Sequence, residues 1–81
     1  MRVRTLFFAS YRDLLGVSQL EVELADGATV SELVRALRGR GGPFEALPPE
    51  PAVAVNRTYT RHDAPLGAGD EVAFIPPVAG G

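Results

Sequence analysis

The sequence predicts an α+β domain, with one mixed five-stranded sheet, a long helix packed across one face of it and a short helix after the first strand. Three observations lead to this fold class: a β-branched and aromatic run at the start, a helical apolar stripe behind a capping box, and a further strand-like run near the end. The 81 residues are enough for one compact domain but not for two. We expect residues 1–76 to form the domain and residues 77–81 a flexible tail.

The first strand and the short helix occupy the first sixteen residues. Arg2 to Phe8 reads as a strand with apolar side chains on both faces, which is typical of a strand inside a sheet. Ser10 is expected to cap the short helix by accepting a hydrogen bond from the N–H of Asp13, and Gly16 to end it. The apolar stripe of this helix would be Tyr11, Leu14 and Leu15.

The second strand and the long helix follow. Leu20, Val22 and Leu24 alternate with two glutamates, as in a half-buried strand. Thr29 and Glu32 have the spacing of a capping box, which predicts a helix start at this point. The buried stripe of that helix is expected to be Val30, Leu33, Val34 and Leu37.

The remaining elements are short. Residues 38–51 read as a linker-like loop, and Ala52 to Val55 as the third strand. A weak fourth strand around Tyr59 should lie at the edge of the sheet, and Glu71 to Ile75 should form the last strand.

Some apolar side chains of the strands cannot pack against the long helix. Leu6, Phe8 and Ile75 have the opposite parity to the residues that would face it. They should lie on the other face of the sheet, under the short helix or exposed. A patch of that kind on a small domain indicates a docking surface.

The side chains do not indicate an enzyme or a metal site. There is no cysteine, and the one histidine, His62, reads as a residue of a surface turn without catalytic partners. Ser10 and Ser31 are better explained by helix ends, and "RGRGG" by a helix stop and a loop. The net charge of −2 gives no reason to expect nucleic acid or a membrane as partner, and we expect a cytoplasmic protein without a leader segment.

All eight basic residues are arginine. One interpretation is that lysine is avoided because its amine accepts acyl groups. The other is a compositional bias of a genome or of a thermophile, and the sequence alone favours it.

The end of the chain suggests chemistry at the backbone carboxylate. That group is an anion and a poor electrophile, but joined to the α-phosphate of ATP it becomes a mixed anhydride that sulfur or nitrogen nucleophiles attack. Gly80 and Gly81 leave the acyl carbon uncrowded, and Pro76 and Pro77 stiffen the exit from the sheet. Val78 to Gly81 would reach about 13–14 Å when extended. The alternative is an ordinary frayed terminus.

Three segments resemble one known family. They are "LFFASYRDLLG" (Leu6 to Gly16), "APLGAGDEVAFIPPVAGG" (Ala64 to Gly81) and the Val55-Asn56 turn. Together they resemble the small subunits of molybdopterin synthase, which are ubiquitin-like β-grasp sulfur carriers. The resemblance spans nearly the whole chain.

The resemblance implies a sulfur cycle and its partners. An adenylating, E1-like enzyme would activate Gly81 with ATP, and a sulfurtransferase or desulfurase system would convert it to a thiocarboxylate. Gly80, which has no side chain, would leave room around the reacting residue. In a heterotetramer with the large catalytic subunit, the carrier would pass sulfur to cyclic pyranopterin monophosphate. It would itself bind no cofactor and no metal, and it would be the non-catalytic, sulfur-donating subunit. The residues expected to bind partners are Phe8, Tyr59, Ile75, Pro76, Pro77, Val78 and Ala79.

Some positions depart from the family pattern, and other functions stay open. Tyr59 stands where an aliphatic residue is usual, Ile75 where phenylalanine is, and Ala79 where a small hydroxyl residue is. The alternatives are a carrier for thiamine or tRNA thiolation, a ubiquitin-like modifier, and a β-grasp interaction module whose tail is inert.

Overall fold

The computed structural model describes residues 1–78 of the chain. The elements are β1 (Arg2–Phe7), α1 (Ala9–Leu15), β2 (Gln19–Glu23), α2 (Val30–Arg38), the 3₁₀ helix η1 (Gly42–Ala46), β3 (Ala52–Val55), β4 (Thr58–Tyr59) and β5 (Glu71–Ile75). Most of the predicted tail, Ala79 to Gly81, lies outside the described residues, so its flexibility stays a prediction.

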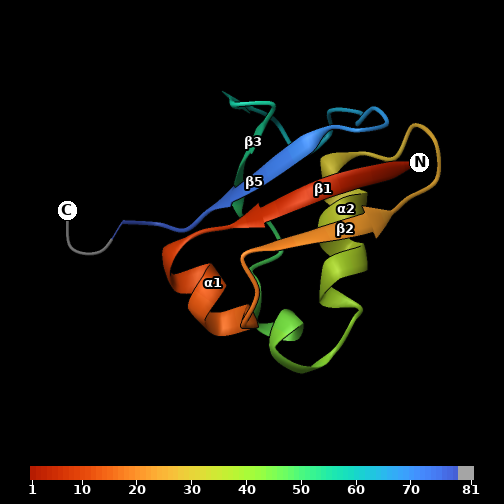
Figure 1. Ribbon diagram of the computed structural model, residues 1–81. Helices are drawn as coiled ribbons and strands as arrows, with labels where there is room; N and C mark the ends of the chain where they lie inside the picture. The colour runs from red at the N-terminus through yellow and green to blue at the C-terminus, as the bar shows by residue number, and fades with distance from the viewer. Residues whose placement is uncertain (79–81) are drawn as a thin grey trace.

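The five strands form one mixed sheet in the order β2-β1-β5-β3-β4 (Figure 1). β1 pairs with β5 in parallel, and all other neighbours are antiparallel. The strands nearest the two ends of the chain therefore lie side by side inside the sheet. The weak strand β4 lies at an edge, which confirms the prediction made from Tyr59.

The core fills the space between the sheet and α2, which crosses behind β1 and β2 in Figure 1. The predicted helix stripe is confirmed, since none of its four residues is more than 2% exposed. Phe7 and Phe74 pack between neighbouring strands with ring centroids 5.3 Å apart. The sheet contributes mainly its inward-facing residues to this core: Val3, Phe7, Val22, Val53, Val72 and Phe74.

The capping box starts α2 as predicted. The N–H of Glu32 donates to Oγ1 of Thr29 over 3.2 Å, and the N–H of Thr29 donates to Oε1 of Glu32 over 3.3 Å. These two bonds satisfy backbone donors that a helix start would otherwise leave unpaired. The register of the buried stripe is thereby set at its first residue.

The predicted cap of α1 is wrong. The helix begins at Ala9, its N-cap is Phe8, and Ser10 lies inside the first turn without a capping bond. The reason is that β1 ends at Phe7 and the chain turns at once, so the N–H groups of Tyr11 and Arg12 donate to the carbonyl of Phe8. The end of the helix is as expected, with Gly16 in the left-handed region at φ 75°.

Two further predictions need correction. Leu14 is 38% exposed, because the seven-residue helix α1 buries only the narrow stripe of Tyr11 and Leu15. Residues 38–51 are not simply a loop, because they contain the end of α2, the 3₁₀ helix η1 and the core residue Leu47, which is 1% exposed. No helix among residues 1–78 has the length and apolar character needed to cross a membrane.

Replacing Leu33 with alanine should lower the free energy of unfolding by about 2–5 kcal/mol, because the side chain is fully buried between α2 and the sheet. The matched control is Arg35→Ala in the same helix, where the exposed side chain should be worth about 0.5 kcal/mol or less. Urea unfolding followed by circular dichroism measures both differences. Equal losses in the two variants would contradict the assignment of the buried stripe.

Candidate functional site

The face of the sheet opposite α2 carries a row of small and apolar side chains. Ala73 of β5 is paired with Leu6 of β1 on one side and with Ala54 of β3 on the other. Tyr59 of β4 is paired with Ala54 and ends the row. Paired residues point to the same face, so these four side chains lie together. Tyr59 is 74% exposed, which is far more than a core tyrosine would be.

A second row lies closer to the point where the chain leaves the sheet. Ile75 is paired with Ala52, and the preceding pair, Phe7 with Phe74, places Phe8 next to Ile75. The backbone of Phe8 is extended, with φ −117° and ψ 157°, so its side chain continues the alternation of β1 and lies on the open face. Phe8 is 46% exposed and Ile75 is half-buried.

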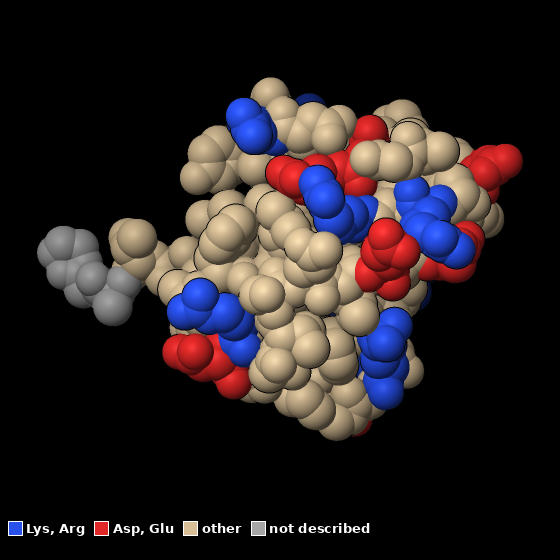
Figure 2. Space-filling model, viewed as in Figure 1, with Lys and Arg blue, Asp and Glu red and all other residues tan. Residues whose placement is uncertain are grey.

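These two rows form one largely apolar surface, which we name the docking face and define by Leu6, Phe8, Ala54, Tyr59, Ala73 and Ile75. Figure 2 looks onto it, and a tan area extends from the middle of the sheet to the root of the tail. The structure thus brings together Phe8 and Ile75, which strand parity placed on one face, and Tyr59, which the family resemblance added to them. Of the predicted tail contacts, Pro76 is half-buried, Pro77 is exposed and Val78 is 88% exposed.

The other half of the same face is charged. Nη2 of Arg4 lies 2.7 Å from a carboxylate oxygen of Glu71, and Nε of Arg2 lies 2.9 Å from one of Glu23. These ion pairs join β2, β1 and β5 at the ends of the strands that lie away from the tail. Exposed pairs stabilise a fold only slightly. Their main consequence here is a surface divided into one apolar half and one charged half.

The turn that presents Tyr59 is fastened to the start of β5. Asn56 and Arg57 have φ 49° and 73°, the left-handed conformation of a tight hairpin turn. Oδ1 of Asn56 accepts from the N–H of Glu71, and its amide donates to Asp70, each over 3.0 Å. The sequence singled out Val55-Asn56 only by resemblance, whereas the structure shows its physical role.

A hollow of about 310 Å³ lies at the root of the tail, and sequence reasoning missed it. Tyr11 lines it from α1, and prolines line it from the segment before β3 and from the start of the tail. Burial raises the pKa of the Tyr11 phenol above its ordinary value. The only signal in the sequence was the density of prolines. Among the residues that form this hollow are Tyr11, Pro48, Pro51, Ile75, Pro76 and Pro77.

His62 has a structural contact instead of the free surface position expected of it. Its Nε2 lies 2.6 Å from the carbonyl oxygen of Pro51, and the residue is half-buried. Because a carbonyl oxygen only accepts, Nε2 carries the proton and donates. The bond ties the loop before β5 to the start of β3. Within residues 1–78, no three side chains of histidine, aspartate or glutamate come together as metal ligands would.

Comparison with known proteins places the chain in a family. The profile described as the ThiS family matches residues 5–81. The chain belongs to the ThiS family. Among its relatives, the molybdopterin synthase sulfur carrier subunit of Escherichia coli is 43% identical over 82 residues, covering 98% of this chain and 99% of that protein. The resemblance found at the two ends of the sequence is therefore confirmed.

Solved structures of related proteins have the same fold. Small archaeal modifier protein 1 of Haloferax volcanii superposes with a TM-score of 0.83 at 26% identity, covering 95% of this chain and 98% of that one. Subunit 1 of the molybdopterin-converting factor of Helicobacter pylori, solved in complex with subunit 2, superposes with a TM-score of 0.70 at 24% identity over the full length of both chains. The predicted ubiquitin-like β-grasp fold of this ThiS-family chain is confirmed.

The remaining site predictions fall on the last three residues. Ala79, Gly80 and Gly81 lie outside the described residues, so their assigned roles stay predictions. What the structure supplies is their point of departure, next to the docking face.

The Tyr11 phenol gives a prediction for alkaline pH. Because its pKa is raised in the folded state, the unfolded chain releases this proton at lower pH than the folded chain does. The contribution of Tyr11 to stability should therefore be complete below about pH 10 and decline as the pH rises further. Urea unfolding across this range should show a smaller decline for Tyr11→Phe than for the unmodified chain. The same decline in both proteins would contradict the assignment.

Proposed function

We propose that this chain is the sulfur carrier, or small subunit, of a molybdopterin synthase. In this proposal Gly81 is adenylated, becomes a thiocarboxylate and gives its sulfur to cyclic pyranopterin monophosphate during molybdenum cofactor biosynthesis. The observation that carries the proposal is the 43% identity, over nearly the full length of both chains, to a protein with that name. The apolar docking face beside the tail root supports it independently.

The chemistry takes place on the main chain. The carboxylate of Gly81 attacks the α-phosphate of ATP, and pyrophosphate leaves. A sulfide nucleophile then attacks the acyl carbon of the adenylate, and AMP leaves. A terminal glycine suits this reaction because it has no Cβ beside the reacting carbon, and Gly80 allows close approach to a narrow channel. The carrier binds no cofactor in this scheme, since the adenylating partner consumes the ATP and a sulfurtransferase supplies the sulfur.

The docking face explains how the tail finds the catalytic subunit. Phe8, Tyr59 and Ile75 would be buried against the large subunit in a heterotetramer, and aromatic residues are frequent among the residues that dominate binding energy. Pro76 and Pro77 leave the sheet at the border of this face, so the tail enters the partner at a fixed place. We place the complex in the cytoplasm.

A second candidate function is that of a ubiquitin-like modifier. The structural similarity to small archaeal modifier protein 1, with a TM-score of 0.83, favours it specifically. Both functions need an activated Gly81, but a modifier forms an amide with a protein amine, whereas a carrier ends as a thiocarboxylate. The mass of the activated product distinguishes the two.

Deleting Gly80 and Gly81 should abolish sulfur transfer and leave folding unchanged, because neither residue has a side chain to contribute to the core. The measurement is molybdopterin formation with the large subunit, the adenylating enzyme, ATP and a sulfur source. Mass spectrometry of the full chain in the same mixture should show oxygen replaced by sulfur at the terminus. Normal molybdopterin formation by the truncated chain would overturn the proposal.

Ile75→Asp and Phe8→Asp should each weaken binding to the large subunit by about 2 kcal/mol or more, roughly 30-fold in Kd, because each places a charge in an apolar contact. The matched control is Ala36→Asp, which adds the same charge on the exposed side of α2, away from the docking face. Isothermal titration calorimetry measures the three affinities. Unchanged binding of the two docking-face variants would refute the face while leaving the tail chemistry untouched.

A further inference from the structure

The side chains of this protein include no amine and no thiol that could attack an activated acyl group. Its 81 residues include eight arginines, no lysine and no cysteine. Amines and thiols are the side chains that react fastest with acyl adenylates and thioesters, whereas an arginine guanidinium stays protonated and has no free lone pair. The one primary amine in this sequence is the α-amino group of Met1.

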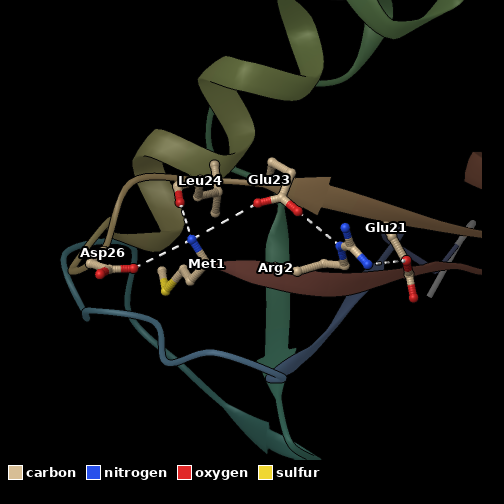
Figure 3. Close-up of polar contacts among 6 residues, drawn as sticks. All are labelled: Met1, Arg2, Glu21, Glu23, Leu24 and Asp26. Carbon is tan, nitrogen blue, oxygen red and sulfur yellow. Dashed lines mark hydrogen bonds and ion pairs between the residues drawn. The ribbon is translucent and has the colours of Figure 1, made fainter.

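The structure holds that amine in place. As Figure 3 shows, the nitrogen of Met1 points at oxygens of the β2 end and the turn that follows. It donates to the carbonyl of Leu24 over 2.6 Å and lies 3.3 Å from Asp26 and 3.9 Å from Glu23. An ammonium group has no lone pair, so attack on an acyl carbon requires both loss of a proton and departure from these contacts.

The position of the amine also separates it from the chain's own end. The parallel pairing of β1 with β5 places Met1 and Ile75 at opposite ends of the sheet (Figure 1). Ile75 lies level with Phe8, and Phe8 is seven residues from Met1 along the strand. Met1 and Ile75 are therefore separated by roughly 23 Å. The chain that follows Ile75 spans about 20–22 Å even when fully extended. Residues 76–78 continue past the end of β5 and not back along the sheet (Figure 1).

We propose that this composition and geometry make the carrier inert toward its own activated terminus, within one molecule and between molecules. The inference rests on the proposed function, because it concerns the fate of the Gly81 adenylate. The excluded reaction is an aminolysis in which nitrogen bonds to the acyl carbon, the bond from that carbon to the AMP oxygen breaks, AMP leaves and the amine loses a proton. Because this aminolysis is excluded, the adenylate remains available to the sulfur nucleophile, and the product is the thiocarboxylate and not an amide.

The arginines retain the other roles that lysine could have filled. Arg4 pairs with Glu71, and Arg2 pairs with Glu23, through charge-assisted hydrogen bonds of 2.7 and 2.9 Å. Arg40 stacks over the ring of Phe44 with its guanidinium carbon 5.3 Å from the centroid. Ion pairing and stacking are thus retained without a nucleophilic nitrogen.

The proposal has a consequence for the modifier function. If an activated copy attaches to a lysine of another protein, the attached carrier presents no lysine for the next copy. The carrier can therefore modify each acceptor lysine once but cannot build lysine-linked chains of itself.

The test uses a full chain whose Gly81 is made into a thioester by intein cleavage, without any adenylating enzyme, sulfur donor or large subunit. Arg35 is the site of the test variants, because it is exposed on α2, away from the docking face. Arg35→Lys adds one amine, and Arg35→Gln is the matched control that removes the guanidinium without adding one. Intact mass and denaturing electrophoresis follow each concentrated sample at mildly alkaline pH.

The unmodified chain and Arg35→Gln should only hydrolyse, whereas Arg35→Lys should form covalent dimers and longer chains at a rate at least about tenfold higher. Covalent dimers of the unmodified chain at the rate of the lysine variant would overturn the proposal. So would their absence in the lysine variant when added butylamine does consume the same thioester. The proposed sulfur-carrier function could fail in its own assay without changing either result.

A second measurement isolates the contacts of Met1. Acetylation by an N-hydroxysuccinimide ester should be slower for the unmodified chain than for a chain with Gly-Ser placed before Met1, because the extension moves the amine away from Leu24, Glu23 and Asp26. Equal acetylation rates would show that these contacts do not slow the reaction of the Met1 amine, and this result would overturn that part of the proposal.

Discussion

The parallel pairing of β1 with β5 is the constraint on which the rest of the structure depends. It joins the first strand of the chain to the last one, with Thr5 opposite Val72 and Phe7 opposite Phe74. Because parallel strands end at the same edge of a sheet, the chain leaves β5 beside Phe8. Without this pairing the tail root and the docking face would not be neighbours. The same pairing places Met1 at the far end of the sheet, away from the root of the tail.

The two faces of the sheet have different tasks. One is closed by α2, whose buried stripe makes the core, and it provides stability. The other is open and divided, with apolar side chains near the tail and ion pairs such as Arg4 with Glu71 farther away. Since a buried charge in an interface is costly when it is unpaired, this division keeps the docking half free of that cost. A small domain thereby supplies both a rigid support and a surface for its partners.

Much of the fold could be predicted, because local signals and tertiary packing agree there. The capping box at Thr29 and the alternation in Glu71 to Ile75 are confirmed to the residue. The predictions that failed concern places where tertiary contacts determine the local structure. Ser10 was a plausible cap in isolation, but the immediate turn after Phe7 shifts the helix start to Ala9. The bond from His62 to Pro51 joins residues eleven apart in sequence, which no local pattern reveals.

The candidate site was predictable to a different degree. Strand parity alone placed Phe8 and Ile75 on one face, and the structure confirms this placement. The hollow beside Tyr11 was not predictable, because it is formed by three segments that meet only in the folded chain. The restraint of the Met1 amine was likewise invisible, since it depends on the carbonyl of Leu24 and the turn after β2. The absence of lysine was visible from the start, whereas its proposed chemical role also depends on the restrained Met1 amine.

The central claim is that the reactive atom of this protein belongs to its own backbone terminus, and that the sheet serves to present it. The most direct measurement uses a chain with one uncleavable aspartate added after Gly81, supplied with the adenylating enzyme, a sulfur source and the large subunit. The account predicts an unchanged free energy of unfolding, no thiocarboxylate and no molybdopterin. Molybdopterin formation at the rate of the unextended chain would contradict it.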